Sequence, residues 1–387
     1  MPDGSVGIFD PSLALKADVA NARDLRISGS FFDLLRSRKP AEAVTWRDVR
    51  ALLLERNRRL NAPEQLRALH ERMRESLLSE AGEIVDFTRL LGRTATRALL
   101  PLVIDGLGAE ARAVLIADLD VKFRKLLAPS EKIPLRLGLS DLGGEWAAGR
   151  VVAHQLKRRL SGRDPPREDF AEAILTLVGR LTVARAAYLV STLLTAISGS
   201  PGTSSACLLY ELLRWPDWRD RIRAEFAALA PGELHAMPAD RLPVTVRFIK
   251  ETMRLWAFPL ITRRVVDRDM QVGETRIAEG GTFDLSSYVM HHSELYWDDP
   301  EAFDPDRWLP SRKPPASGTY APFGFGPRTC VGASIAFSQL ILFCQLAACA
   351  FEFEVEAGRS PAIRLQGVAV PGDFVGILRP RSDSGRP

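Results

Sequence analysis

The sequence lacks several features that mark special classes of protein. It has four cysteines in 387 residues, too few and too unevenly spread for a disulfide framework, so we expect reduced thiols. The formal net charge is only +4, a balance too even for a protein that binds nucleic acid. Residues 1–15 have no basic patch followed by an apolar run, so we expect no signal peptide. Together these absences favour a cytoplasmic protein.

Long uninterrupted apolar runs are also scarce. The stretches 186–210 and 329–351 contain no charged residue and are long enough to span a membrane, but small polar residues and glutamines interrupt them. We therefore interpret both as buried helices and expect no membrane anchor. No internal repeat is present, which excludes a solenoid.

What the sequence does contain is the pattern of a large helical core. The composition is 46% hydrophobic and 26% charged, and residues 40–260 place apolar side chains at helical spacing. After Arg264, short alternating segments separated by glycines, Met270–Ile277 and Thr282–Leu285, predict a small sheet. Five prolines exclude a regular helix over residues 300–315. The predicted fold class is mainly α with a small β region.

The most informative segment is Pro322–Gly332, which reads PFGFGPRTCVG. Cys330 lies just ahead of a predicted helix, whose N-terminus we expect to stabilise a thiolate, and the glycines let backbone amides approach the sulfur. A thiolate in a tight loop suits iron, and one known use is as the proximal ligand of haem. The alternative is a turn that carries a buried structural cysteine.

This segment resembles the cysteine loop of the cytochrome P-450 haem-thiolate enzymes, Phe-x-x-Gly-x-Arg/His-x-Cys-x-Gly. All five defined positions are filled, by Phe323, Gly326, Arg328, Cys330 and Gly332. The resemblance implies a haem b cofactor with Cys330 as the iron ligand and Phe323, Arg328 and Gly332 around it.

The resemblance also implies how the chain is organised. It runs from about residue 46 to residue 375, which implies one helical domain over residues 46–378 around a buried haem. Residues 1–45 then form a shortened N-terminal segment, and residues 379–387 a disordered tail.

A second motif supports the resemblance. Glu251 and Arg254 match Glu-x-x-Arg, whose spacing places both side chains on one helical face. Arg307 lies in a proline-rich segment that resembles the family's meander. The resemblance implies that these three form a buried structural network, which is costly unless every partner is satisfied. Without Arg307, the pair is an ordinary surface ion pair.

Haem propionates require cations, and the resemblance assigns several. Trp46 and Arg50 match Trp-x-x-x-Arg, whose spacing aims both side chains the same way over the haem edge. Arg264 and Arg328 occupy two further propionate-binding positions. Each arginine has the alternative interpretation of a solvated surface charge.

The distal side departs from the family pattern. In the predicted central helix, Gly199 stands where the family has an acid and Ser200 where it has a threonine, and Pro201 follows directly. The acid and the alcohol normally relay protons during oxygen activation. Ser200, Ser198 or Thr203 could hold a water for the same purpose, because a hydroxyl both donates and accepts. The alternative is a simple kink in a buried helix.

By resemblance, apolar side chains after the Glu-x-x-Arg helix, in the central helix and in a C-terminal turn line the substrate pocket: Ile197, Phe258, Leu260, Ile261 and Val368. They suggest a small hydrophobic substrate, although each side chain is equally explained as core. His291 and His292 are interpreted as structural, since no second set of metal ligands accompanies them.

Three functions remain open at the level of sequence. The first is a haem-thiolate monooxygenase of specialised metabolism that receives electrons from a separate redox protein such as a ferredoxin, because no flavin, nicotinamide or iron–sulfur motif is present. The second is a haem-thiolate isomerase, dehydratase or cyclase acting on a peroxide or preactivated substrate. The third is a non-catalytic protein of the same fold, with a partner protein that completes the pocket over the short N-terminal segment.

Overall fold

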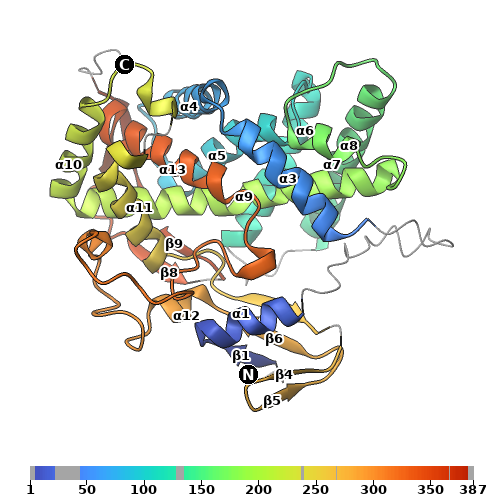
Figure 1. The fold of residues 1–387 in the computed structure, drawn as a ribbon. Coiled ribbons are helices and arrows are strands. Elements are labelled where there is room, and N and C mark those ends of the chain that lie inside the picture. The colour runs from blue at the N-terminus through green and yellow to red at the C-terminus, as the bar shows by residue number, and fades with distance from the viewer. Residues whose placement is uncertain are drawn as a thin grey trace.

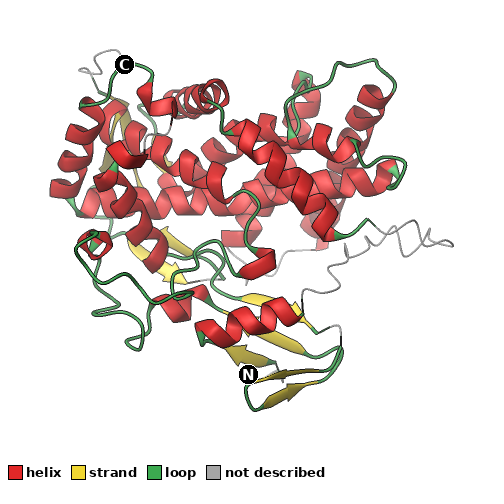
Figure 2. Cartoon of the chain, viewed as in Figure 1, coloured by secondary structure: helices red, strands yellow, loops and turns green. Residues whose placement is uncertain are grey.

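The computed structural model describes residues 5–21, 44–127, 135–236, 239–266, 268–365 and 367–381. Helices form one large body, and most strands gather at one side of it (Figures 1 and 2). The helices of the first half are α1 (Pro11–Ala20), α3 (Trp46–Leu60), α4 (Pro63–Leu78), α5 (Phe87–Val103), α6 (Ala109–Leu127), α7 (Leu135–Leu160) and α8 (Phe170–Leu175). The later ones are α9 (Val183–Arg214), α10 (Pro216–Ala227), α11 (Pro243–Leu255), α12 (Ser287–His291) and α13 (Ala333–Gln345), which continues as a π-helical turn, Leu346–Ala350.

The core of the helical body is built around α9, which crosses its middle in Figure 1. Helix α5 packs closely on α9. A Cβ atom added at Gly202 of α9 would lie only 2.5 Å from the Gly92 Cα of α5. Only glycine at position 202 allows the two backbones to approach so closely, and glycine at position 92 leaves room for the Phe123 ring of α6. The uncharged stretch 186–210 is thus part of a core helix, as predicted.

The second uncharged stretch also forms part of the core. Ala333–Ala350 is long and apolar enough to cross a membrane, but 61% of this window is buried inside the fold. Its buried side chains, including Leu342 and Phe343, belong to the main hydrophobic cluster. The extent of burial agrees with the prediction that this stretch forms a buried helix.

Four small sheets accompany the helices. They comprise β1 (Val6–Ile8), β6 (Thr282–Leu285) and β3 (Thr262–Val265) in one sheet, β2 (Ile84–Asp86), β10 (Val375–Pro380) and β7 (Phe351–Val355) in a second, and the pairs β4 (Met270–Val272) with β5 (Thr275–Ile277) and β8 (Ala362–Leu365) with β9 (Ala369–Gly372). The predicted sheet region after Arg264 is confirmed, whereas strands outside it were not foreseen.

The two ends of the described chain differ from the sequence prediction. β1 pairs in parallel with β6, and α1 packs on the cysteine loop, so the described residues 5–21 are an integral part of the fold. The disordered tail does not begin at Arg379, because Arg379 pairs with Glu352 and Pro380 with Phe351 across β10 and β7. Backbone pairing extends this strand two residues into the predicted tail; residues 382–387 lie outside the described part.

Candidate functional site

The cysteine loop is a tight turn held by its own backbone. Cys330 N–H donates to the Phe323 carbonyl at 2.8 Å, and Thr329 N–H donates to the Gly326 carbonyl at 3.2 Å. Gly324 and Gly326 have φ angles of 82° and 47°, in the left-handed region that favours glycine. The turn delivers Cys330 to the start of α13, where Gly332 is the N-cap residue.

The Cys330 thiol faces accessible space although protein surrounds it. The residue is exposed, yet burial raises the pKa of its thiol, and the Gly332 N–H and Arg50 oppose this shift only in part. The start of α13 favours the thiolate through the Gly332 N–H, as expected, but desolvation is the larger effect and keeps the pKa of the thiol raised. A bound metal ion would deprotonate the thiol outright.

Helix α3 brings the next predicted residues to the cysteine loop. Thr45 and Asp48 form a capping box that begins α3 at Trp46, which packs half-buried on the core. One turn later, Arg50 donates from Nη1 to the Thr329 carbonyl, beside Cys330. The Asn57 amide donates to the Val331 carbonyl at 2.8 Å and fixes the same helix on the far side of the cysteine.

Arg264 and Arg328 reach the same region from two other elements. Arg264 of β3 donates from Nε to Asp18 Oδ1 at 2.8 Å, while its Nη1 makes only a 3.5 Å contact with the Arg263 carbonyl. Arg328, half-buried in the cysteine loop, contacts the Asn21 carbonyl at 3.5 Å. The terminal nitrogens of Arg264 are thus available to an anion.

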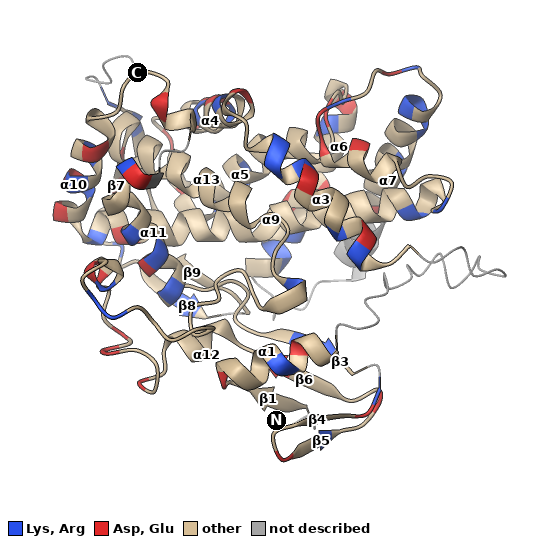
Figure 3. Ribbon diagram, in the orientation of Figure 1, with Lys and Arg blue, Asp and Glu red and all other residues tan. Residues whose placement is uncertain are grey.

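These residues fit a haem. Within the described ranges, no group of three or more His, Cys, Asp or Glu side chains could hold a metal ion, so a metal at Cys330 must bring its other ligands with it. A macrocycle meets that requirement. Its carboxylates would find arginines from α3, β3 and the cysteine loop (Figure 3).

The predicted charge network of Glu251, Arg254 and Arg307 is present, and both Glu251 carboxylate oxygens have hydrogen-bond donors. The Glu251 carboxylate accepts from Arg254 Nε at 3.0 Å and Nη2 at 2.9 Å, and from Arg307 Nε at 2.9 Å. It also accepts from the Asp304 N–H and from Trp308 Nε1, both at 3.0 Å. Sequence reasoning missed Trp308, whose place beside Arg307 in the proline-rich segment was the available signal. Arg307 turns the Glu-x-x-Arg pair into a buried network.

His291 connects the network to the cysteine loop. Arg254 Nη1 donates to the His291 carbonyl at 2.8 Å, and the His291 ring contacts the Arg254 carbonyl through Nδ1 at 2.9 Å. Its Nε2 accepts from the Ala321 N–H at 3.0 Å, just before the cysteine loop. This ring is therefore neutral with its proton on Nδ1, and its role is structural, as the sequence suggested.

His291 predicts an acid-sensitive stability. Burial lowers its pKa from 6.5 to about 3, so between these pH values only the unfolded chain takes up the proton. The free energy of unfolding should fall as pH is lowered through this window, by about 1.4 kcal/mol per pH unit from this group. Urea denaturation at several pH values should show a shallower dependence for His291→Gln. The control is His154→Gln, an exposed histidine of α7; equal slopes for both variants would contradict the assignment.

On the distal side, the position of the missing acid is filled by neighbouring side chains. A Cβ atom at Gly199 would lie 2.9 Å from Leu126 Cδ2 of α6 and 3.6 Å from Phe258 Cζ. The Ser198 hydroxyl donates to the Thr195 carbonyl at 2.8 Å, and the Thr203 hydroxyl to the Ser200 carbonyl at 3.1 Å. Ser200 has no such bond in the described structure, so of these three hydroxyls it is the one whose proton is not already donated to a carbonyl.

The closure at Gly199 can be tested by adding one methyl group. An alanine usually stabilises a helix interior by about 0.5–1 kcal/mol relative to glycine. Gly199→Ala should lack this gain because the methyl group displaces Leu126, whereas Leu126→Ala should restore it. The matched control is Gly149→Ala in α7, where no neighbouring atom lies within 4 Å. Equal gains in chemical denaturation at both glycines would show that the site is open.

The residues assigned to the substrate pocket lie in different environments. Phe258 reaches Gly199, and Ile197 packs half-buried on the core. Ile261 is 51% exposed, Leu260 is half-buried with its carbonyl bonded to Ser286, and Val368 is buried before β9. The structure thus joins the central helix to Phe258, and the assignment of the other residues to one pocket stays a prediction.

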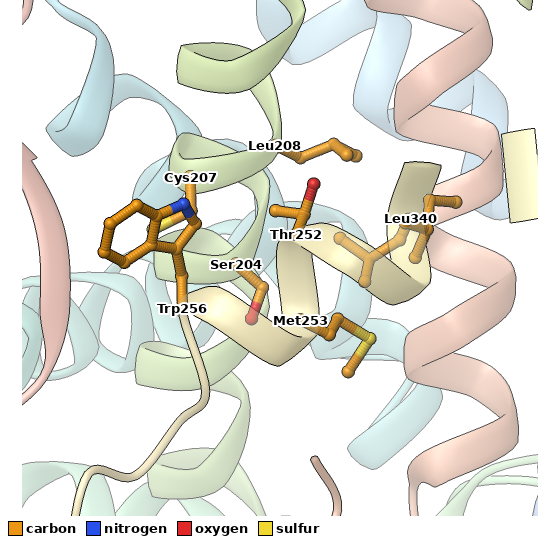
Figure 4. Close-up of a pocket in the computed structure, with 8 residues that line it drawn as sticks. Ser204, Cys207, Leu208, Thr252, Met253, Trp256 and Leu340 are labelled. Atoms are coloured by element: carbon orange, nitrogen blue, oxygen red, sulfur yellow. The ribbon is translucent and has the colours of Figure 1, made fainter. Parts of the chain in front are cut away.

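A small cavity lies farther along α9 (Figure 4). Its lining comes from α9, α11, the residue after α11, and α13: Ser204, Cys207, Leu208, Ile249, Thr252, Met253, Trp256 and Leu340. Its volume is 10 Å³, room for about one water molecule. It shares no residue with the predicted pocket and is too small for an organic substrate.

Comparison with known proteins agrees with this arrangement. The family model of cytochrome P-450 matches residues 151–373, more than half of the chain. A cytochrome P-450 monooxygenase of Gibberella zeae is 30% identical over 204 residues, which are 50% of this chain and 47% of that protein. The mitochondrial 25-hydroxyvitamin D-1 alpha hydroxylase of Mus musculus is 31% identical over 175 residues, 44% of this chain and 34% of that protein. The matches span less than half the length of these relatives.

Solved structures share the fold over nearly the whole chain. The haem domain of cytochrome P-450DA has a TM-score of 0.76 at 19% identity, covering 97% of this chain and 87% of that one. A zebrafish cytochrome P-450 with abiraterone has a TM-score of 0.76 at 20% identity, covering 98% and 93%. With the cysteine loop, the charge network and the family match in agreement, the chain belongs to the cytochrome P-450 family.

Proposed function

We propose that this chain is a haem-thiolate monooxygenase that oxidises a small hydrophobic molecule in specialised metabolism. The observation that carries the proposal is the exposed Cys330 in its glycine-rich loop. Arg50 binds the carbonyl of the neighbouring Thr329, and Arg264 and Arg328 contact Asp18 and Asn21 of the α1 segment that packs on the same loop. The family binds haem b. Cys330 would hold the iron, and Arg50, Arg264 and Arg328 would hold the propionates.

The chain's own residues would divide the remaining work. When bound, the haem supplies the redox chemistry. The Gly332 N–H supports the sulfur, and the Phe323 carbonyl fixes the backbone of Cys330. Ser200 is the distal group able to donate or accept a proton, because the Ser198 and Thr203 hydroxyls are occupied by helix carbonyls.

The proposal is tested by two measurements on the purified protein. The reduced, carbon-monoxide-treated sample should show the red-shifted Soret band of thiolate-ligated haem; its absence would remove the proposal. Turnover of an apolar substrate should then require O2 and an electron donor. Ser200→Ala should lower this turnover more than it lowers substrate-induced spectral shifts.

A second function is favoured by the closed position at Gly199. The Leu126 side chain lies where a side chain at position 199 would extend, and Phe258 is at contact distance. An isomerase, dehydratase or cyclase that starts from a peroxide suits this distal side, since it needs no proton relay. Conversion of organic hydroperoxides without O2 or reductant would establish this function. Strict dependence on both would exclude it.

Under the monooxygenase proposal, electrons come from a separate redox protein such as a ferredoxin, and both proteins are cytoplasmic. Helix α3, which contacts the cysteine loop, carries the exposed Arg47, Arg58 and Arg59, which suit an acidic partner (Figure 3). Electron transfer should slow steeply as salt concentration rises. A rate independent of salt would argue against this docking face.

A further inference from the structure

Two neighbouring arginines of β3 provide an internal comparison. Arg263 and Arg264 point to opposite faces of the strand, and each pairs with a buried aspartate. Arg263 donates from Nε to Asp284 Oδ1 at 2.9 Å and from Nη2 to Oδ2 at 2.8 Å, so both carboxylate oxygens are satisfied. This is the usual two-bond geometry of an arginine and a carboxylate.

The pair on the other face is incomplete. Arg264 donates to Asp18 only through Nε. Asp18 is 0% exposed, and in the described structure its Oδ2 atom has no hydrogen-bond partner. A buried carboxylate oxygen without a donor is costly, so an incomplete pair calls for an explanation. In the described structure, the Arg264 terminal nitrogens make no bond to Asp18, and their contact is the 3.5 Å approach of Nη1 to the Arg263 carbonyl.

Asp18 also lies against the cysteine loop. Its Oδ2 is 3.9 Å from the position that a Cβ atom would take at Gly326, four residues before Cys330. Helix α1 thus inserts one fixed negative charge between the cysteine loop and the arginine that is suited to a propionate. The charge is compensated by Arg264 alone in the described structure, and so the pair is neutral overall.

We infer that Asp18 is a positioning residue for the haem, an inference that rests on the proposed haem site. By holding Nε of Arg264, Asp18 aims the two terminal nitrogens at a propionate. By neutralising Arg264, it prevents the arginine from adding a net positive charge beside the haem and so keeps the reduction potential low. The N-terminal segment thereby takes part in cofactor binding through α1.

The charge effect is tested in the haem-loaded protein by Asp18→Asn, which keeps the Oδ1 acceptor for Arg264 and removes only the charge. We expect a positive shift of the haem reduction potential, because removing one negative charge near the haem makes the added electron more favourable. The matched control is Asp284→Asn on the opposite face, which should leave the potential unchanged. Equal potentials in wild type and Asp18→Asn, or equal shifts in the two variants, would overturn the inference.

The positioning effect is tested by the rate at which haem passes to excess apomyoglobin. Asp18→Ala should release haem several-fold faster than wild type, and it should add nothing in an Arg264→Gln background, because it acts through Arg264. Additive effects would contradict a role through Arg264. If Asp18→Ala does not fold, the isosteric Asp18→Asn potential decides alone. A wild type without a thiolate-type spectrum would instead refute the proposed haem site itself.

Discussion

Cys330→Ala is expected to abolish the thiolate-type Soret band of the reduced, carbon-monoxide-treated protein. Cys330 is the accessible cysteine held by the glycine-rich loop, with Arg50 bonded to its neighbour Thr329 and the Gly332 N–H directed at its sulfur. No other side chain in the described part offers a comparable ligand set. The loss should therefore be complete, while far-ultraviolet circular dichroism remains that of the wild type.

Cys344→Ala is the matched control for this experiment. Cys344 lies fully buried in α13, where burial raises the pKa of its thiol far above the ordinary range. A buried, protonated cysteine behaves as a small hydrophobic residue. Its replacement should cost about 1 kcal/mol of stability and keep the band. Loss of the band in both variants, or in neither, would contradict Cys330 as the iron ligand.

The second large effect is expected at Arg254, which uses all its donors in a fully buried site. Besides Glu251, Arg254 bonds the carbonyls of His291 at 2.8 Å, Pro300 at 2.7 Å and Ala302 at 3.0 Å. Arg254→Met leaves the Glu251 carboxylate buried without its main counter-charge. Urea denaturation should show a loss of about 3–5 kcal/mol in the free energy of unfolding, the usual cost of breaking a buried ion pair.

An exposed ion pair sets the baseline for Arg254. Arg379 and Glu354 contact each other at 3.0 Å with side chains 53% and 71% exposed, so Arg379→Met should cost at most about 1 kcal/mol. Adding Glu251→Gln to Arg254→Met should recover part of the loss, because the uncompensated charge is then removed. A loss for Arg254→Met no larger than that for Arg379→Met would show that the network does not brace the fold.

Much of this architecture could be predicted from short stretches of sequence. The cysteine loop is defined by residues within eleven positions, and its glycines and the following apolar helix are visible without tertiary information. The charge network required one long-range partner, and the resemblance supplied Arg307. The place of Trp308 beside Arg307 was visible in the sequence, but that its indole donates to the same carboxylate depends on how the proline-rich segment packs on α11.

What the sequence could not predict are contacts that depend on how distant elements pack. Arg264 was foreseen as a propionate ligand, but its partner Asp18 is 246 positions away. Leu126 meets Gly199 only because α6 lies across α9. The raised pKa of the Cys330 thiol has the same origin. The helix start that lowers this pKa is visible in the sequence, but the desolvation that raises it depends on how the surrounding protein packs.

The parallel pairing of β1 with β6 has a consequence for the order of folding. Val6 pairs with Phe283, so β1 must wait for a partner strand that is made only after helices α3 to α11 have been synthesised. Contacts of such long sequence separation form late, because a large loop has to close before they stabilise the chain. In vectorial synthesis, the helices from α3 to α9 can assemble first. Strand β1 and helix α1, although they emerge before these helices, then dock late and seal the cysteine loop against its neighbours.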